Sequence, residues 1–168
     1  MRYRVKGKQE NSKMCFVCGL KNPAGLRACF YELDGGELLA RFRAGEEHQG
    51  YPGRLHGGIA AAILDETIGR VIMRRGSQTF WFVTLEFGIR YRKPIPLGEE
   101  LRARCRLGGE KGRIFEGSGE ILLPDGSVAA EGWGKYLKTP LEGISGLDSE
   151  QLEWRVVSAG DDPAEVEL

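Results

Sequence analysis

The chain has 168 residues, of which 24 are basic, 24 are acidic and 41% are hydrophobic. This length predicts one domain with short extensions, which buries roughly 70% of its unfolded surface. No apolar run is long enough to span a membrane, and the basic first residues lack the apolar stretch of a secretory signal. We therefore expect a cytoplasmic protein whose cysteines stay reduced.

Basic and acidic side chains are separated along the chain. Up to Thr139 there are 23 Lys and Arg against 16 Asp and Glu, whereas from Pro140 onward there is 1 against 8. The basic part suits an anionic ligand. A nucleic acid is disfavoured because no recognition helix stands out and the isoelectric point is near neutral. Residues 140–168 are predicted to be an acidic, solvated tail that begins with a short helix near Ser149.

Residues 1–20 form a predicted N-terminal extension that contains Cys15 and Cys18. Their spacing suits a metal site or a redox pair, but a structural zinc site needs four ligands. The other two cysteines, Cys29 and Cys105, are isolated in the sequence. Cysteines from two subunits would complete a zinc site, yet packing of a small turn is the simpler interpretation, and we expect no bound metal.

Two strands, Leu26–Leu33 and Leu38–Arg43, are predicted around a glycine turn. A loop then leads into His56-Gly57-Gly58, where the pattern predicts the start of a helix. The first N–H groups of a helix have no partner inside it and carry partial positive charge. Glycines let a ligand oxygen approach this backbone closely. The pattern therefore indicates an oxyanion-binding site.

One acidic residue, Asp65, lies at the edge of the apolar stripe of this predicted helix. An acid beside apolar side chains is costly unless it is used or satisfied. Its neighbour Glu66 points away from the stripe and has the spacing of a surface ion pair with Arg70. We therefore favour Asp65 as a general base or nucleophile, with a structural carboxylate as the alternative. The stripe consists of Leu64, Ile68, Val71 and Ile72.

The spacing between Gly57 and Asp65 constrains any shared chemistry. Eight residues span about 12 Å along a helix axis, whereas a reacting carbonyl lies about 3 Å from both its oxyanion donor and its attacking group. One helix cannot supply both groups to the same carbonyl. The motif therefore predicts an active site between subunits, with two such sites in a two-fold dimer.

Two histidines flank this loop. We expect His56 to position the loop that presents Gly57, or simply to cap the helix, rather than to act as a general base, because no acid nearby in the sequence is placed to orient it. His48 is expected to be exposed to solvent.

Four more strands are predicted after the helix, over Phe80–Lys93, Glu100–Leu107, Gly112–Leu123 and Val128–Leu137. In the first of them the apolar residues alternate, which predicts one shared face for Trp81, Val83, Leu85, Phe87, Ile89 and Tyr91. One long helix among about six strands predicts an α+β protein with an antiparallel sheet.

Arginines alternate along two of these strands. If the strands pair, their charges merge into a basic patch that ends near Lys93. Such a patch either holds phosphate groups through charge-assisted hydrogen bonds or is a solvated outer face of the sheet. The residues are Arg90 and Arg92 on one strand and Arg102, Arg104 and Arg106 on the next.

The runs PGRLHGGIAAAILDETIG and TLEFGIRYRKPIPLGEEL resemble the hotdog-fold acyl-CoA thioesterases, as does the opening CFVCGLKNPAGL. The likeness extends from about Cys15 to Leu137. It is strongest to the branch typified by the phenylacetate-pathway thioesterases and their mammalian Akt-binding relatives. The resemblance implies a hotdog domain over residues 21–139, in which a sheet of five to six strands wraps around one long central helix.

The resemblance also implies roles for individual residues. Gly57 matches the glycine whose N–H polarises the thioester carbonyl, Asp65 matches the catalytic acid, and His56 matches the histidine before the glycine pair. The family's Asn or Gln in the loop corresponds to Gly50, with Gln49 beside it, and its Ser or Thr after the acid is replaced by Glu66. The expected catalytic residues are Asp65, Gly57 and His56, and the expected substrate-binding residues are Gly58, Gln49, Gly50, Thr67, Arg92 and Lys93.

The expected function is hydrolysis of an acyl-CoA thioester without a cofactor, by a homodimer or a dimer of dimers, with no nucleic acid or membrane as partner. One alternative is an enoyl-thioester hydratase or dehydratase, but such proteins pair the acid with a later histidine that is missing here. The other is a non-catalytic acyl-CoA-binding protein, whose expected mark is loss of the acid.

Overall fold

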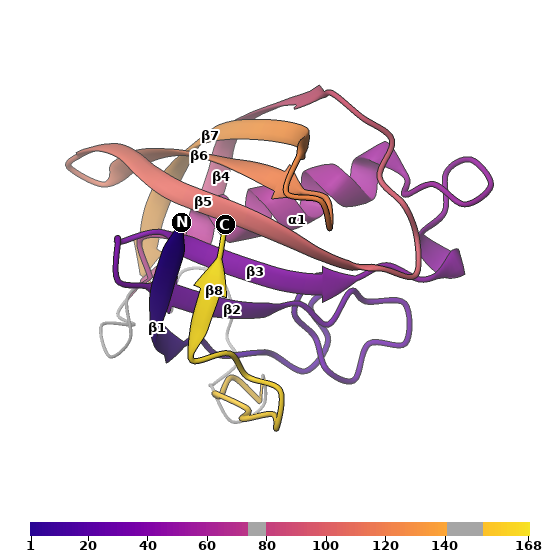
Figure 1. Ribbon diagram of the computed structural model, residues 1–168. Coiled ribbons are helices and arrows are strands. Elements are labelled where there is room, and N and C mark those ends of the chain that lie inside the picture. Colours follow the sequence, from indigo (N-terminus) through magenta and orange to yellow (C-terminus); the bar gives the residue numbers. More distant parts are fainter. Residues whose placement is uncertain (74–79, 141–152) are drawn as a thin grey trace.

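A computed structural model describes residues 1–73, 80–140 and 153–168, and its ribbon shows a curved sheet around one long helix (Figure 1). All strand pairs are antiparallel, in the order β4-β7-β6-β5-β3-β2-β1-β8. The strands are β1 (Arg2–Lys8), β2 (Cys29–Leu33), β3 (Leu38–Arg43), β4 (Phe80–Tyr91), β5 (Glu100–Lys111), β6 (Ile114–Leu122), β7 (Val128–Pro140) and β8 (Glu165–Glu167). The helices are α1 (Gly57–Arg70) and the short 3-10 helix η1 (Glu46–His48).

The expected α+β class and the antiparallel sheet around a helix are confirmed, but the sheet has eight strands rather than five to six. The two extra strands come from the segments expected to flank the domain. Strand β1 pairs with β2, and β8 pairs with β1 through Tyr3 and Val166. The predicted tail helix near Ser149 lies outside the described residues. None of the described helices is long and apolar enough to cross a membrane.

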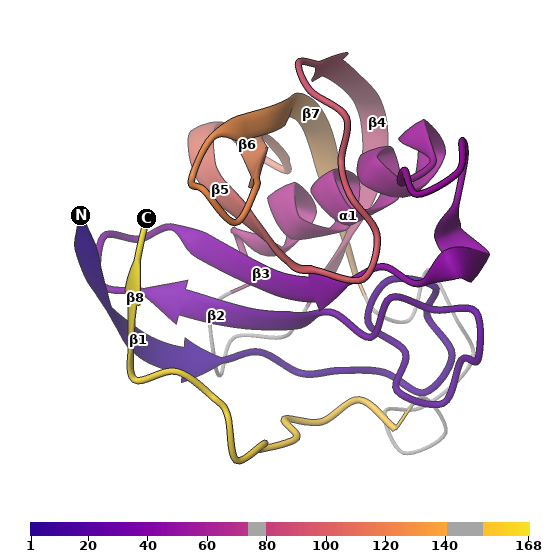
Figure 2. The same ribbon diagram turned by 45° about the vertical axis from the view of Figure 1, so that its right-hand side comes forward.

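The core lies between α1 and the concave face of the sheet. Ile63, Leu64 and Ile68 of α1 are completely buried, together with Phe115 of β6 and Tyr136 of β7. Burial of each large apolar side chain contributes about 1.5–3 kcal/mol. This packing fixes the height of α1 above the sheet, and Figure 2 shows the helix lying along the inside of the curve.

Strand β4 does not present one continuous apolar face, so that prediction is wrong. Its pairing with β7 shifts between Thr84 and Glu86, which leaves Leu85 as the extra residue of a bulge. Phe82 before the bulge and Phe87 after it both pack on the core, although their odd and even positions predict opposite faces. Leu85 itself is 53% exposed.

Strand β4 also forms one edge of the sheet (Figure 2). It approaches α1 so closely that a Cβ atom added to Gly69 would come within 2.2 Å of the Phe82 ring. The edge position leaves one side of the β4 backbone without a partner strand among the described residues. Exposed Val83 and Leu85 lie on this strand. These properties make β4 the part of the sheet that is best suited to pair with another chain.

Candidate active site

The loop before α1 is held by its own hydrogen bonds. The Gly53 N–H donates to Gln49 Oε1 at 3.1 Å, and the Gly50 N–H donates to the Arg54 carbonyl at 2.9 Å. Gln49 and Gly50 are exposed. His48 is only 3% exposed, and its Nε2 lies 2.9 Å from the Ala24 carbonyl oxygen. The expectation of an exposed His48 is therefore wrong, because the ring holds the loop against an earlier segment.

His56 caps the N-terminus of α1. Its Nδ1 accepts a hydrogen bond from the Gly58 N–H at 2.9 Å, and its carbonyl accepts from the N–H groups of Ile59 and Ala60. The Gly57 N–H donates to no group among the residues that the structure describes. The cap therefore occupies the amide of Gly58 and leaves the amide of Gly57 available to a ligand oxygen.

Tyr91, at the end of β4, fixes this helix start from the sheet. Its hydroxyl donates to the Gly57 carbonyl at 2.7 Å. A Cβ atom at position 57 would lie 3.1 Å from that hydroxyl oxygen, so a larger residue there requires the tyrosine side chain to shift by a few tenths of an ångström. Tyr91 was not predicted as a site residue, because a tyrosine at the end of a strand carries no signal of a helix contact.

Asp65 lies in the middle of α1 and is held by two hydroxyl groups from the sheet. Thr84 Oγ1 of β4 donates to Oδ1 at 3.0 Å and to Oδ2 at 3.2 Å. Tyr136 Oη of β7 lies 3.2 Å from Oδ1. The carboxylate is therefore oriented by neutral donors and has no cation within ion-pair distance among the described side chains. Asp65 was predicted as a site residue from the sequence, but its two hydroxyl partners were not, and they follow it by 19 and 71 residues.

The surroundings of Asp65 favour the protonated form of its carboxyl group. Burial raises the pKa of Asp65, and the hydrogen bonds from Thr84 and Tyr136 offset this only in part. Burial also raises the pKa of Tyr136, with the Asp65 charge as a further cause, so this phenol stays protonated as a donor. A carboxylate with a raised pKa is a stronger base than an exposed one.

The two residues after Asp65 have structural roles in this subunit. Glu66 pairs with Arg70 at 2.8 Å, but the Arg70 side chain is only 1% exposed, so the predicted surface pair is a buried one. Thr67 is completely buried, and its hydroxyl donates to the Ile63 carbonyl at 2.6 Å. Thr67 therefore offers no exposed surface to a substrate, contrary to its expected role.

The predicted arginine patch is assembled differently from the expectation. Strands β4 and β5 do not pair, because β7 and β6 lie between them. Acidic residues also enter the patch, since Arg92 pairs with Glu131 at 2.7 Å and Arg104 pairs with Glu120. Lys93 is exposed and lies outside this hollow. The arginines that line the hollow, of about 440 Å³, are Arg90, Arg92, Arg104 and Arg106.

The family model described as "Thioesterase superfamily" matches residues 52–130, a range that contains Gly57, Asp65, Thr84 and Tyr91. Acyl-coenzyme A thioesterase THEM4 of Rattus norvegicus is 31% identical over 109 residues, which cover 64% of this chain and 46% of that protein. This chain thus spans less than half the length of that relative.

Two solved structures extend the comparison. The thioesterase superfamily protein RHA08564 is 28% identical with a TM-score of 0.65, over 72% of this chain and 58% of that one. The protein BH2602 from Bacillus halodurans, solved with CoA, is 27% identical with a TM-score of 0.54, over 60% of this chain and 66% of that one. The chain therefore has the hotdog fold, and within residues 52–130 it is similar in sequence to the thioesterase superfamily.

Proposed function

We propose that this protein is an acyl-CoA thioesterase, which hydrolyses a thioester to a free acid and CoA. The single observation that carries the proposal is the pairing, on one helix, of an unused Gly57 amide with a half-buried Asp65 carboxylate. The rat relative is named as an acyl-CoA thioesterase, and the Bacillus halodurans structure contains CoA. Both observations fit the chemistry that the Gly57 amide and the Asp65 carboxylate can perform.

The Gly57 N–H donates to the thioester carbonyl oxygen and stabilises the negative charge that develops there during attack. Asp65 supplies the attack on the carbonyl carbon, either by taking a proton from water or by adding directly as a nucleophile. The CoA thiolate then leaves and takes up a proton. On the nucleophilic route the acyl group is left on Asp65 as an anhydride, and water then hydrolyses it to the free acid and restores the carboxylate. His56 acts through the cap that directs the Gly57 amide outward, and it is therefore a positioning residue.

The two groups come from different subunits in this proposal. Asp65 contacts Thr84, whereas Gly57, eight residues earlier on α1, contacts Tyr91, seven residues later on β4. Helix and edge strand therefore run in opposite directions. A two-fold axis that crosses β4 between Phe87 and Gly88 places Thr84 of one copy opposite Tyr91 of the other. This pairing brings Asp65 of one subunit toward Gly57 of the second.

The activity is tested with the purified chain and a panel of short, medium, long-chain and aryl acyl-CoA thioesters, by measuring thiol release. The matched variant is Asp65→Asn, which keeps the size and one acceptor oxygen of the side chain. We expect hydrolysis of at least one thioester by the wild type and a loss of about 10²–10⁴-fold in the variant. Thioester cleavage at the wild-type rate by Asp65→Asn would contradict the assigned role.

The shared site is tested by mixing two inactive variants, Asp65→Asn and Gly57→Pro, under conditions that exchange subunits. A mixed dimer regains one intact site, made from Gly57 of the first variant and Asp65 of the second. Random exchange then restores about one quarter of the wild-type activity, because half of the dimers are mixed and each has one working site. Mixed dimers that form without activity would exclude the shared arrangement.

A further inference from the structure

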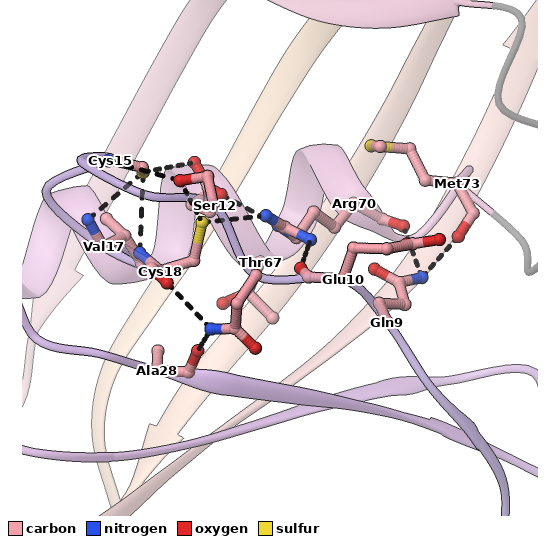
Figure 3. A network of polar contacts seen from close by, with 12 residues as sticks. Gln9, Glu10, Ser12, Cys15, Val17, Cys18, Ala28, Thr67, Arg70 and Met73 are labelled. Carbon is pink, nitrogen blue, oxygen red and sulfur yellow. Dashed lines mark hydrogen bonds and ion pairs between the residues drawn. The ribbon is translucent and has the colours of Figure 1, made fainter. Parts of the chain in front are cut away.

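The Cys15-x-x-Cys18 motif lies against the C-terminal half of α1, where Cys15 contacts Glu66 and Cys18 contacts Arg70 (Figure 3). The two Sγ atoms and a carboxylate oxygen of Glu66 all lie within 4.8 Å of one another. Cys15 is half-buried, whereas Cys18 is completely buried. The proposed hydrolysis uses neither cysteine, so the cluster requires its own explanation.

Backbone hydrogen bonds fix the position of the Cys15 sulfur. The N–H groups of Val17 and Cys18 point to its Sγ at 3.3 and 3.5 Å, and the Gly19 N–H donates to its carbonyl at 2.8 Å. A Cβ atom on Gly19 would come within 2.3 Å of that carbonyl oxygen, so the tight turn requires glycine. The turn thus holds the two sulfur atoms side by side with little freedom.

Arg70 supplies a buried positive charge to the Cys18 sulfur. Its Nη2 lies 3.1 Å from Cys18 Sγ, its Nε lies 2.8 Å from Glu66 Oε1, and its Nη1 donates to the Glu10 carbonyl at 3.0 Å. Figure 3 shows these contacts converging on one guanidinium group. A hydrogen bond from the Cys15 thiol, aided by the Arg70 charge, lowers the pKa of Cys18 to about 7 against the effect of burial.

The same arginine argues against a metal ion in this cluster. The described residues offer three ligand atoms here, whereas structural zinc sites usually have four. The Arg70 guanidinium already provides the positive charge beside Cys18 and Glu66, and a divalent cation at the same place would be repelled by it. The cluster therefore consists of two thiols, one carboxylate and one guanidinium, and it contains its own positive charge.

We propose that Cys15 and Cys18 are a redox-active dithiol that forms a reversible intramolecular disulfide by exchange with a low-molecular-weight disulfide. The proposal is independent of the proposed hydrolysis. Cys15 reacts first because its sulfur is the more exposed of the two. Cys18 first accepts the proton of Cys15 and then acts as the second nucleophile.

The exchange is balanced in two steps. Cys15 attacks one sulfur of glutathione disulfide while its proton passes to the Cys18 thiolate, forms a mixed disulfide and releases one glutathione thiolate, because the hydrogen bond to Cys18 raises the pKa of Cys15. Cys18 then gives its proton to that thiolate and attacks the Cys15 sulfur, which expels a second glutathione. Two protein thiols are oxidised and one glutathione disulfide is reduced to two thiols. Because the Arg70 charge favours the Cys18 thiolate, the reduced protein is stabilised and glutathione reverses the reaction.

The test incubates the full chain in glutathione buffers with a rising proportion of the disulfide, followed by acid quenching, alkylation with N-ethylmaleimide and mass spectrometry. We expect the wild type to lose two alkylatable thiols without retaining glutathione, to give a linked Cys15–Cys18 peptide, and to recover both thiols in reduced glutathione. The matched control Cys29→Ser removes a half-buried cysteine outside the cluster and is expected to lose the same pair.

Two further variants test the order of the steps. Cys18→Ser is expected to stop at a glutathione adduct on Cys15, whereas Cys15→Ser is expected to form no adduct on the buried Cys18. The proposal is overturned if the wild type keeps both thiols in glutathione disulfide alone, the most oxidising buffer of the series, or if the linked peptide contains Cys29 or Cys105. It is also overturned if zinc binds the wild type in a one-to-one complex that both cysteine variants lose.

Discussion

The Thr84 hydroxyl donates to both carboxylate oxygens of Asp65, at 3.0 and 3.2 Å, and so joins the edge strand β4 to the middle of α1. Seven residues later on the same strand, Tyr91 holds the start of α1 through the Gly57 carbonyl. Strand β4 therefore orients both groups of the proposed site. The two side chains that make these contacts, Thr84 and Tyr91, are both neutral hydroxyl donors.

Thr84→Val removes this hydroxyl without changing the size of the side chain. Burial is the main cause of the raised pKa of Asp65, and the Thr84 hydrogen bond works against it. Loss of the hydroxyl raises this pKa further, so the acidic limb of the kcat/KM profile moves to higher pH. Thr84→Ser keeps the donor and is expected to retain the wild-type profile. Identical acidic limbs for Val and wild type would remove Thr84 from the control of Asp65.

Asp65→Asn is expected to cost no stability at neutral pH. Because the folded pKa of Asp65 lies above the unfolded value, about 3.9, the folded state is favoured by protonation. This contribution is present at low pH and is lost as the pH rises through the folded pKa. Asparagine does not ionise, so the variant gains on the wild type as pH increases. Denaturant unfolding at about pH 4 to 8 measures the difference in the free energy of unfolding between the two proteins. A variant that becomes less stable than the wild type as the pH rises would contradict this prediction.

Gly57→Pro removes the proposed oxyanion donor while preserving the helix start. Proline is favoured at the first position of a helix, and His56 already has the φ of −65° and ψ of 136° that suit the residue before proline. We expect kcat to fall by about 10²–10³-fold with little change in helix content by circular dichroism.

Gly57→Ala is the matched control, because it adds a Cβ near Tyr91 but keeps the N–H. It should lose far less activity than the proline variant. Equal losses in both would point to crowding at Tyr91 rather than to the missing amide.

Gly69→Ala tests the close approach of α1 to β4. Alanine gains about 1 kcal/mol in helix propensity over glycine, but overpacking of a core costs about 1–3 kcal/mol. Because the new Cβ would lie 2.2 Å from the Phe82 ring, we expect the cost to dominate and the free energy of unfolding to fall. Phe82→Leu in the same chain should restore part of the loss, and a double-mutant cycle measures this coupling. Additive losses would mean that the clash is relieved elsewhere.

The local patterns of the sequence predicted the helix and its immediate surroundings well. Six of the strands were expected near their observed positions, and β3 was expected with the same bounds. The helix start was also expected at the glycine pair, since capping and apolar periodicity act over a few residues. Strand β1 was missed because its alternation of Tyr3 and Val5 with charged residues resembles a basic terminus.

The partners of the candidate site residues were not predictable in the same way. Thr84 and Tyr136 reach Asp65 only because β4 and β7 pair beneath α1, and nothing near Asp65 in the sequence encodes that pairing. The bulge at Leu85 was unpredictable for the same reason. It arises in the pairing of β4 with β7, whereas the alternation of apolar residues predicts faces only for a strand whose register is unbroken. Arg70 seemed to be a surface residue because helical spacing alone cannot show what covers a helix from outside.

Arg70 links three parts of the chain that lie far apart in the sequence. Its guanidinium bonds to the Glu10 carbonyl and Cys18 in the first segment, pairs with Glu66 on α1, and lies 4.7 Å from the Trp154 ring in the last segment. If either end segment detached, the buried Arg70 guanidinium would lose some of its hydrogen-bond and ring partners. The resulting loss of stability would also weaken the packing of the other two parts. Both ends of the chain and the last turn of the helix should therefore open as a single cooperative unit, with matching rates of amide hydrogen exchange.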